Sequence, residues 1–419
     1  MNAQGAAKHG VRLMVVLALL CAARTAGAQG QDEFFDDSTV HELRLTLNSK
    51  DWSALKQNFK DNIYYPTALQ WRGVNVSNVG IRSRGLGSRS GTKPGLRVDM
   101  DRYNANQTFV GLKSFVLDNL VQDPSMLRER LAMAFFRRLG LPAPREAHAR
   151  LFVNGTYVGL YAIVETIDKG FLGRSFGEDG HGGTENDGYL FEYDYTREYR
   201  FENLGSNYDD YKIFSPKTHE NDASAKIWGP IVDMVKAIND TPDAIFEREL
   251  STYLDLTKFV NHIAIESFLA EDDGILGYAG LNNFYFYRFE DSKRSQFLAW
   301  DKDNTFHDLD FDIMKGVNEN VLARRTLAQS QYRNRYFQQL IDAANSAMEP
   351  DGEQQGNSNN RPGWLEREVA RMSAQIRSAG LADNFKPFGN NEFQSSMNDL
   401  LIFARERADL VKTQVSQRR

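Results

Sequence analysis

Short runs in which apolar and polar residues alternate fill much of the first half of the chain, and this period of two predicts half-buried strands. Residues 51–59 and 125–139 interrupt the alternation with the spacing of amphipathic helices. Asn154-Gly155 joins two of the runs and is the strongest short sequence signal for a hairpin. The runs expected to form strands are VHELRLTLN at 40–48, TALQWRGVNVSNVGIRSRG at 67–85, LRVDMD at 96–101, KSFVLDNL at 113–120, ARLFVNGTYVGLYAIVE at 149–165, DGYLFEYDY at 187–195 and DYKIFSP at 210–216.

Helical periodicity dominates the second half of the chain. One strand pair interrupts it, NNFYFYRFE at 282–290 followed by SQFLAWD at 295–301. Residues 170–188 are rich in glycine and poor in apolar residues, which predicts a loop, and residues 350–362 predict a polar linker. The expected fold class is therefore α+β, with a strand-rich N-terminal lobe followed by a helix-rich C-terminal lobe. The helices expected here are 222–240, 243–250, 256–271, 361–379 and 394–415.

Residues 1–28 have the pattern of a secretory signal peptide. Lys8 and Arg12 precede the apolar run LMVVLALLCAA, and AGA at 26–28 supplies the small residues of a cleavage site. The run is too short to span a bilayer comfortably. A lipoprotein would carry its lipid on Cys21, but Leu20 stands where a small residue is expected. We therefore expect cleavage after residue 28 and a secreted protein, periplasmic or extracellular.

The composition is that of an ordinary globular protein. Of 419 residues, 41% are hydrophobic and 25% are charged, and the net charge is −6. This excludes disorder throughout the chain and argues against nucleic acid or an anionic membrane as the main partner. The chain has one cysteine, which lies in the expected signal peptide, so disulfide scaffolds and thiolate zinc sites are excluded. No second hydrophobic stretch approaches membrane-spanning length.

Several standard catalytic motifs are missing from the sequence: the HExxH zinc motif, the GxSxG nucleophile elbow and the Walker A sequence. His262 and Glu266 share a helical face, which favours helix packing over a metal site. HDLDFD at 307–312 has alternating carboxylates that could hold a cation, but a solvated acidic loop is the commoner explanation.

The loop RSRGLGSRSGTK at 82–93 has the composition of an anion cradle. Glycines let backbone amides approach an anion closely, and three arginines and Lys93 supply positive charge. The glycines miss the G-x-G-x-x-G spacing by one position, so the loop alone favours a basic surface turn.

Acidic and amide side chains gather at the ends of the predicted strand pair. EDDG at 271–274 closes an apolar helix, although acids at a helix C-terminus oppose the helix dipole. Asn283 opens the first strand and Asp301 ends the second. Oxygen ligands of this kind suit magnesium, and an acid beside metal-held phosphates suits phosphoryl transfer, whereas each acid taken singly is equally compatible with a turn.

The order of these motifs resembles that of the spore-coat-protein-H (CotH) kinase family, over roughly residues 40–310. The most specific part is the phrase NGxYxGLYxxxExIDxxFL. The motifs that carry the resemblance are RSRGxGS followed by a lysine at 82–93, D-x-S-x-L-R at 123–128, NGTYVGLYAIVETIDKGFL at 154–172, the acidic turn before NNFYFY, and WDKDNTF at 300–306.

The resemblance implies an atypical protein-kinase-like fold that binds ATP and a divalent metal, Mg²⁺ or Mn²⁺, between an N-terminal lobe (38–169) and a C-terminal lobe (170–415). Asp273 is implied as the catalytic base, and Asp272 remains the alternative. The remaining implied site residues are Arg84, Gly85, Gly87 and Lys93 at the nucleotide phosphates, Glu129 as the ion-pair partner of Lys93, Glu165 facing the adenine, and Asn283 and Asp301 at the metal.

The function expected from this resemblance is transfer of the ATP γ-phosphoryl group to serine or threonine of a protein acceptor. ATP is scarce outside the inner membrane, so the signal peptide argues against routine use of ATP or for a modified donor. One alternative is a non-catalytic, kinase-like protein that binds a surface or matrix partner. A glycoside hydrolase with paired carboxylates is a weaker one. The aromatic residues offered for recognition in the non-catalytic alternative are Tyr195, Tyr199, Tyr208 and Tyr211.

Overall fold

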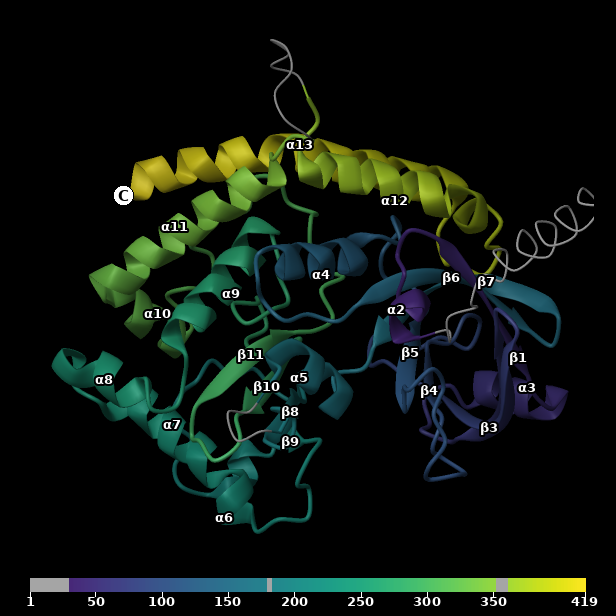
Figure 1. Ribbon diagram of the computed structural model, residues 1–419. Coiled ribbons are helices and arrows are strands. Elements are labelled where there is room, and N and C mark those ends of the chain that lie inside the picture. The colour runs from purple at the N-terminus through teal and green to yellow at the C-terminus, as the bar shows by residue number, and fades with distance from the viewer. Residues whose placement is uncertain (1–29, 179–182, 352–360) are drawn as a thin grey trace, which may run out of the picture.

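The computed structural model describes residues 30–178, 183–351 and 361–419. The expected signal peptide and most of the predicted polar linker lie outside these residues. A closed barrel forms the N-terminal lobe, and helices packed around a second sheet form the C-terminal lobe (Figure 1). The predicted α+β class and the order of the two lobes are confirmed. Within the described residues, no helix is long and apolar enough to cross a membrane.

The barrel is built from short strands whose inward-facing side chains form their own apolar core. Its order is β1-β2-β3-β4-β5-β7-β6, and the parallel pair β1 and β6 closes it. Asn154 and Gly155 have φ values of 49° and 82°, as a type I′ turn requires, so the predicted hairpin is confirmed. The strands are β1 (Val40–Thr46), β2 (Tyr65–Trp71), β3 (Val74–Ser83), β4 (Leu96–Asp99), β5 (Ser114–Asp118), β6 (Glu146–Val153) and β7 (Thr156–Glu165).

The second sheet has the order β11-β10-β8-β9 and is antiparallel throughout. It contains the predicted aromatic strand pair, so that prediction is confirmed. All residues of β10 and β11 are buried, which agrees with their largely aromatic and aliphatic composition. The strands are β8 (Tyr189–Tyr193), β9 (Phe214–Pro216), β10 (Phe284–Arg288) and β11 (Ser295–Ala299).

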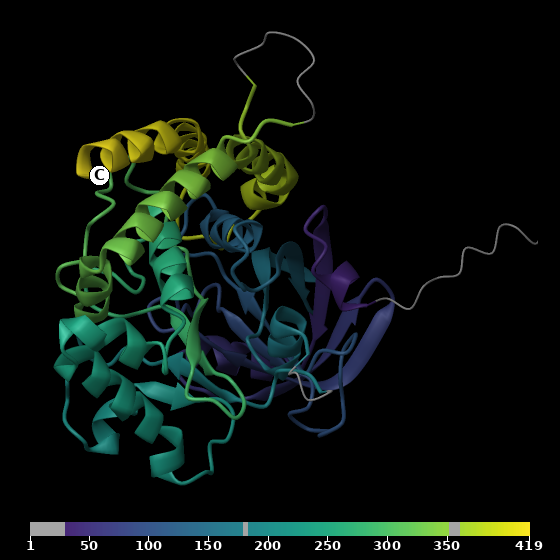
Figure 2. The ribbon, with the colours of Figure 1, turned by 60° about the vertical axis from the view of Figure 1, so that its left-hand side comes forward.

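The longer helices form one layer over the other elements. Figures 1 and 2 show α12 and α13 side by side, crossing above α4, α9 and α11. The α-helices are α2 (Gln31–Phe34), α3 (Ser49–Gln57), α4 (Arg128–Arg138), α5 (Lys169–Phe176), α6 (Ser224–Ile227), α7 (Gly229–Asp240), α8 (Phe246–Leu250), α9 (Leu256–Phe268), α10 (Val321–Ala328), α11 (Ser330–Ala347), α12 (Trp364–Leu381) and α13 (Asn390–Arg418); 3₁₀ turns cover Tyr208–Tyr211 and Asp243–Ile245.

Two helical regions differ from the sequence prediction. The glycine-rich segment predicted as a loop contains α5, because the Asp168 side chain caps the helix by accepting from the amides of Gly170 and Phe171. The prediction also missed α10 and α11. The buried face of α11 includes Tyr332, Tyr336 and several alanines, which give a weaker apolar signal than leucine or isoleucine does.

Candidate active site

The glycine-rich loop that follows β3 faces the end of the β10–β11 hairpin across a cavity of about 580 Å³. The loop comes from the barrel lobe and the hairpin from the helical lobe. The lining therefore brings together side chains that lie about 200 residues apart in the sequence. The expected site residues that line it are Arg84, Gly85, Gly87, Asp273, Asn283 and Asp301.

Asp273 is held by two amide side chains. Ala270, just after α9, has φ 56° and turns the chain into the acidic segment. Asp273 Oδ2 then accepts hydrogen bonds from Nδ2 of Asn282 and of Asn283, both at 3.1 Å. Burial raises the pKa of Asp273, and the two amide donors oppose that rise. The carboxylate is thus fixed in orientation at the cavity wall, as a general base must be.

The alternative base, Asp272, has a different environment. Its Oδ1 lies 2.7 Å from the ammonium of Lys315, in a partly exposed ion pair. Asp273, and not Asp272, is among the described residues that line the cavity. The geometry therefore favours Asp273.

Asn283 directly precedes Phe284, the first paired residue of β10, and Asp301 follows its partner Ala299 by two positions, so both lie at the same end of the hairpin. Both have left-handed backbones, with φ 57° and 52°. Asn and Asp enter this region at lower cost than other residues with side chains, and such conformations cluster at functional sites. The two turns direct an amide and a carboxylate to one cavity.

The donor set at this point fits a divalent cation that also binds phosphate. Asp301 and Asn283 offer oxygen ligands, which Mg²⁺ prefers, and Asp303 lines the same cavity. No group of three or more His, Cys, Asp or Glu in the described part of the chain is arranged to hold a metal alone. Mg²⁺ commonly uses one or two carboxylates together with substrate phosphates, and the residues present fit that pattern.

Buried carboxylates crowd the inner end of the cavity. Burial raises the pKa of Asp301 to about 6, with Arg84 opposing and Asp118 adding to the rise. Burial also raises the pKa values of Asp303 and Glu129 well above their usual range, and neighbouring carboxylates raise them further. Such crowding is unfavourable for ionised acids unless positive charge joins them.

Arg84 provides positive charge from the barrel side. Its guanidinium lies 5.6 Å from the ring centroid of Trp300 and 3.7 Å from Asp118 Oδ2. Burial acts to lower the pKa of Arg84, but Asp118 and Asp301 outweigh it and raise the pKa, and Glu129 adds to the rise. Glu129, on α4, is therefore within electrostatic reach of Arg84, and this arginine is placed to meet phosphate charge.

The loop next to Arg84 is shaped by glycine and closed by arginine. Gly85 has φ 105°, and a Cβ there would lie 2.4 Å from Ser88 Oγ. Arg89 Nε donates to the carbonyl of Gly85 at 2.7 Å and so closes the turn. Leu86, at the tip, is 81% exposed. The loop is therefore a protruding, backbone-rich turn of the kind that approaches anions.

The structure corrects the expectation for Lys93. Its ammonium is fully buried, 2.7 Å from Asp383 Oδ2, and it donates to the carbonyl of Leu160 at 2.8 Å. Among the described residues, the cavity lining includes Arg84 but not Lys93. Lys93 therefore does not line this cavity. It is also not the ion-pair partner of Glu129, because it forms its ion pair with Asp383, just after α12.

The structure also corrects the expectation for Glu165. Its carboxylate is buried between two arginines, with Oε1 2.7 Å from Arg145 Nη2 and Oε2 2.6 Å from Arg174 Nη2. Both oxygens are satisfied by these arginines, so the side chain is not placed to face an adenine. Residues 166–168, which follow it, line a second cavity instead.

This second cavity, of about 560 Å³, lies where the chain crosses between the lobes. It shares Arg82 and Glu192 with the first cavity, so the two adjoin, and together they are called the groove below. Leu190 and Tyr285 are also in its lining. This cavity had no direct signal in the sequence, because its wall comes from five strands, three loops and the start of α5.

Lys302 is a further residue that the sequence analysis missed. Its ammonium is buried, 2.8 Å from Glu266 Oε1, and it donates to the carbonyl of Asn283 at 2.8 Å. Glu266 Oε2 accepts from the amide of Ile275 at 3.0 Å. The pair therefore joins α9, the acidic turn and the start of β10. The sequence signal that could have identified Lys302 is its position between Asp301 and Asp303, just after a buried strand. His262, 3.2 Å from Glu266, belongs to this packing, as expected.

A glycine-rich loop, a half-buried arginine and a carboxylate–amide–carboxylate set, facing one another between two lobes, are the parts of a kinase-like site. Residues 81–411 match the CotH kinase protein family, and the chain belongs to that family.

The inner spore coat protein H of Bacillus subtilis (strain 168) is 22% identical over 390 residues, covering 91% of this chain and 99% of that protein. An inner spore coat protein H-like protein of the same strain is 36% identical over 59 residues, or 14% of this chain and 19% of that protein.

Two solved structures are similar at low TM-scores. The Shewanella oneidensis MR-1 toxin–antitoxin complex of HipA, HipB and operator DNA gives a TM-score of 0.37 at 11% identity, covering 89% of this chain and 74% of that chain. The Helicobacter pylori proinflammatory kinase CtkA gives 0.26 at 12% identity, covering 77% and 94%. The family assignment rests on the sequence match.

Proposed function

We propose that the protein is an ATP-dependent protein kinase that transfers the γ-phosphoryl group to a serine or threonine hydroxyl. The observation that carries the proposal is the single cavity lined by the glycine-rich loop and by Asp273, Asn283 and Asp301. Family membership supports the use of ATP in general.

The nucleotide would lie along the groove, with its base beside residues 166–168 and its phosphates beneath the glycine-rich loop. Backbone amides of the loop and the guanidinium of Arg84 would meet the phosphate oxygens. Catalysis of phosphoryl transfer is mostly positioning and charge neutralisation, which fixed groups of this kind supply.

Asp273 would orient the acceptor hydroxyl and take its proton as the oxygen attacks the γ-phosphorus. The bond from that phosphorus to the β,γ-bridging oxygen breaks, and ADP leaves with the electron pair. Asn283 and Asp301 would hold Mg²⁺ or Mn²⁺, which when bound neutralises charge on the phosphates.

The test is a nucleotide-binding and transfer assay on the mature protein. With ATP and Mg²⁺ or Mn²⁺ at about 100 times the dissociation constant, we expect stabilisation of roughly 2.7 kcal/mol, seen as a thermal shift. Radiolabel should then pass from [γ-³²P]ATP to a protein acceptor or to the protein itself. The absence of both the shift and the transfer, with either metal, would contradict the proposal.

The capture of Lys93 by Asp383 favours one alternative, a kinase-like protein without catalysis that binds a surface or matrix partner. Of the tyrosines considered for recognition, Tyr199 and Tyr211 are buried, which leaves Tyr195 and Tyr208 near the surface. The same assay separates the two functions, since the alternative predicts no transfer to any acceptor.

We also propose that the protein is exported and acts on an acceptor outside the cytoplasm. The support is the basic, apolar and small-residue pattern of residues 1–28. Mass spectrometry of the protein from its native host should find an N-terminus near Gln29. An intact N-terminus at Met1 in the mature protein would overturn this.

A further inference from the structure

Two anchors tie the phosphate side of the candidate active site to the region of helix α12. One reaches the glycine-rich loop through Lys93 and Asp383. The other reaches helix α4 through Arg130, Asp37 and Arg371. Their polar groups lie outside the lining of the two cavities described above, so the nucleotide-binding roles proposed there do not explain them.

The first anchor is a fully buried ion pair. Lys93 Nζ lies 2.7 Å from Asp383 Oδ2, and both side chains are 0% exposed. Asp383 Oδ2 accepts from the amide of Leu160 at 3.0 Å, and Lys93 donates to the carbonyl of the same residue at 2.8 Å. Gly159 has φ 130°, and a Cβ there would lie 2.6 Å from Asp383 Oδ2 and 2.8 Å from Lys93 Cε. The Lys93–Asp383 pair can therefore pack against β7 only because residue 159 has no side chain.

The glycine-rich loop is connected to this pair by backbone and amide hydrogen bonds. Asn119 Nδ2 donates to the carbonyls of Lys93 and Ser88, at 2.8 Å and 2.9 Å. The amide of Arg84 donates to the carbonyl of Gly95 at 2.9 Å and closes the base of the loop. The position of Lys93 therefore sets the position of the whole turn, including the phosphate-facing arginine.

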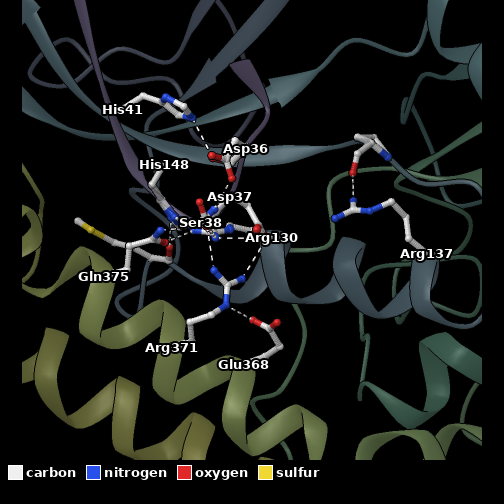
Figure 3. A network of polar contacts seen from close by, with 12 residues as sticks. Asp36, Asp37, Ser38, His41, Arg130, Arg137, His148, Glu368, Arg371 and Gln375 are labelled. Carbon is white, nitrogen blue, oxygen red and sulfur yellow. Dashed lines mark hydrogen bonds and ion pairs between the residues drawn. The ribbon is translucent and has the colours of Figure 1, made fainter. Parts of the chain in front are cut away.

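The second anchor gathers three side chains around Asp37 (Figure 3). The carbonyl of Asp37 accepts from Arg130 Nη2 at 2.5 Å, Arg371 Nη1 at 2.9 Å and Gln375 Nε2 at 2.9 Å. Its carboxylate lies 3.0 Å from Arg371 Nη2 and 3.4 Å from Arg130 Nη2. The segment before β1 thereby joins α4 to α12.

Arg130 is the neighbour of Glu129 on α4. Arg130 Nη1 donates to His148 Nδ1 at 2.6 Å, and His148 Nε2 donates to the carbonyl of Met126 at 2.8 Å, which ties the start of α4 to β6. Successive side chains on a helix point about 100° apart. Holding Arg130 in the Asp37 cluster therefore fixes the direction of Glu129, which is buried and lies within electrostatic reach of Asp301 and Asp303 in the cavity lining.

We propose that α12 is the positioning element of the nucleotide site. Through Asp383 it sets the place of the glycine-rich loop, and through the Asp37 cluster it sets the rotation of α4. Lys93, Asp383, Asp37 and Arg130 are positioning residues that act through the loop and Glu129. The inference rests on the proposed function for the use of this geometry, whereas the anchoring itself is measurable without nucleotide.

The test of the first anchor compares Asp383→Asn with Asp399→Asn. Asp399 offers the same change of charge at an exposed position of α13. In Asp383→Asn, hydrogen exchange of residues 84–92 should become faster. The affinity for ATP–Mg²⁺ should fall about tenfold or more, because misplaced binding groups lose much of their contribution. The control should retain both values.

The second anchor is tested by Asp37→Asn, with Asp36→Asn as the matched change of charge. The Asp36 carboxylate accepts from the amide of Ser38 at 2.9 Å, and among the described residues none of its hydrogen bonds or ion pairs reaches α4 or α12. We expect faster exchange at residues 128–132 and weaker ATP–Mg²⁺ binding for Asp37→Asn alone, at a temperature where circular dichroism shows both variants folded.

The outcomes are distinct. Unchanged exchange of the loop in folded Asp383→Asn, together with unchanged exchange of α4 in Asp37→Asn, overturns the proposal. If Asp383→Asn fails to fold, the Asp37 pair of variants decides alone. Faster local exchange in a protein that, unmutated, binds no ATP–Mg²⁺ supports the anchoring and overturns the proposed function.

Discussion

The carboxylate of Asp273 lies 3.1 Å from the side-chain amide of Asn283, so the proposed base and the proposed metal-side ligand share a hydrogen bond. The ammonium of Lys302 donates a hydrogen bond to the backbone carbonyl of Asn283. A shift of the hairpin would therefore move the base together with the metal-side residues. Substitutions that keep the shape of a carboxylate therefore test its chemical role, since the hydrogen bonds around it continue to hold the hairpin in place.

Asp301→Asn should abolish metal-dependent nucleotide binding. The substitution removes the charged ligand two residues after β11 but keeps the shape and the left-handed backbone that asparagine tolerates. ATP affinity measured calorimetrically, with and without Mg²⁺, checks this. Binding of ATP–Mg²⁺ equal to that of the unmutated protein would show that the metal assignment is wrong.

Asp273→Asn should spare nucleotide binding and remove phosphoryl transfer, by roughly a hundredfold or more. The base is needed only when the hydroxyl attacks, so the loss should appear in kcat and not in the nucleotide dissociation constant. Steady-state kinetics and calorimetry on the same preparation separate the two quantities. Full transfer activity in this variant would exclude Asp273 as the base.

Arg84→Met should weaken ATP–Mg²⁺ binding by about tenfold to a hundredfold, because charge-assisted contacts to phosphate are strong in a buried cavity. Arg84→Lys, which keeps the charge but loses the planar fork, should recover part of the affinity. Thermal melts of both variants control for the loss of the Asp118 contact. Unaltered affinity would assign the phosphate contacts to Arg82 or Arg89.

Glu146→Gln should flatten the dependence of stability on pH. Glu146 is fully buried, and both its oxygens are without a hydrogen-bond partner among the described residues. Burial raises the pKa of Glu146 to about 8, and Arg137 opposes the rise. The folded state therefore keeps a proton that the unfolded state releases near pH 4.5, so the free energy of unfolding falls as pH rises between these values.

By pH 7 this effect amounts to about 3 kcal/mol, and the glutamine variant should escape it. Urea unfolding of both proteins at pH 5, 7 and 8.5 measures the difference. Glu42→Gln, at an exposed position, is the control and should keep the slope of the unmutated protein. Parallel pH profiles for Glu146→Gln and the unmutated protein would contradict the prediction.

Much of the fold followed from local sequence signals. The alternating runs, the Asn154-Gly155 turn and the aromatic strand pair all specify their own conformation within a few residues, so the barrel strands and the β10–β11 hairpin were predictable. α11 was missed because its buried face mixes Phe337 and Leu340 with tyrosines, alanines and Gln339, and the burial of these less apolar positions depends on contact with the neighbouring helices α9 and α13.

The site was predictable only where backbone geometry directs the side chain. Asn283 and Asp301 sit at strand ends, and the hairpin brings them together whatever the rest of the chain does. The ends of long side chains were not predictable. Lys93 and Arg84 lie on the same loop, but Arg84 lines the cavity and the Lys93 side chain is buried in the core. Lys93 is buried because it pairs with Asp383, which lies 290 residues further along the chain.

The ion pair between Asp37 and Arg371 has a consequence for folding during synthesis. The two residues are 334 positions apart, so the ribosome must synthesise α12 before this contact can form. Pairings of such long sequence separation form late in folding. A nascent chain that ends before α12 can complete the strand pairings of its barrel, but Arg130 then lacks its C-terminal neighbours and the phosphate side has no fixed geometry. We therefore expect the proposed nucleotide site to gain its fixed geometry only after α12 has been synthesised and has packed against Asp37.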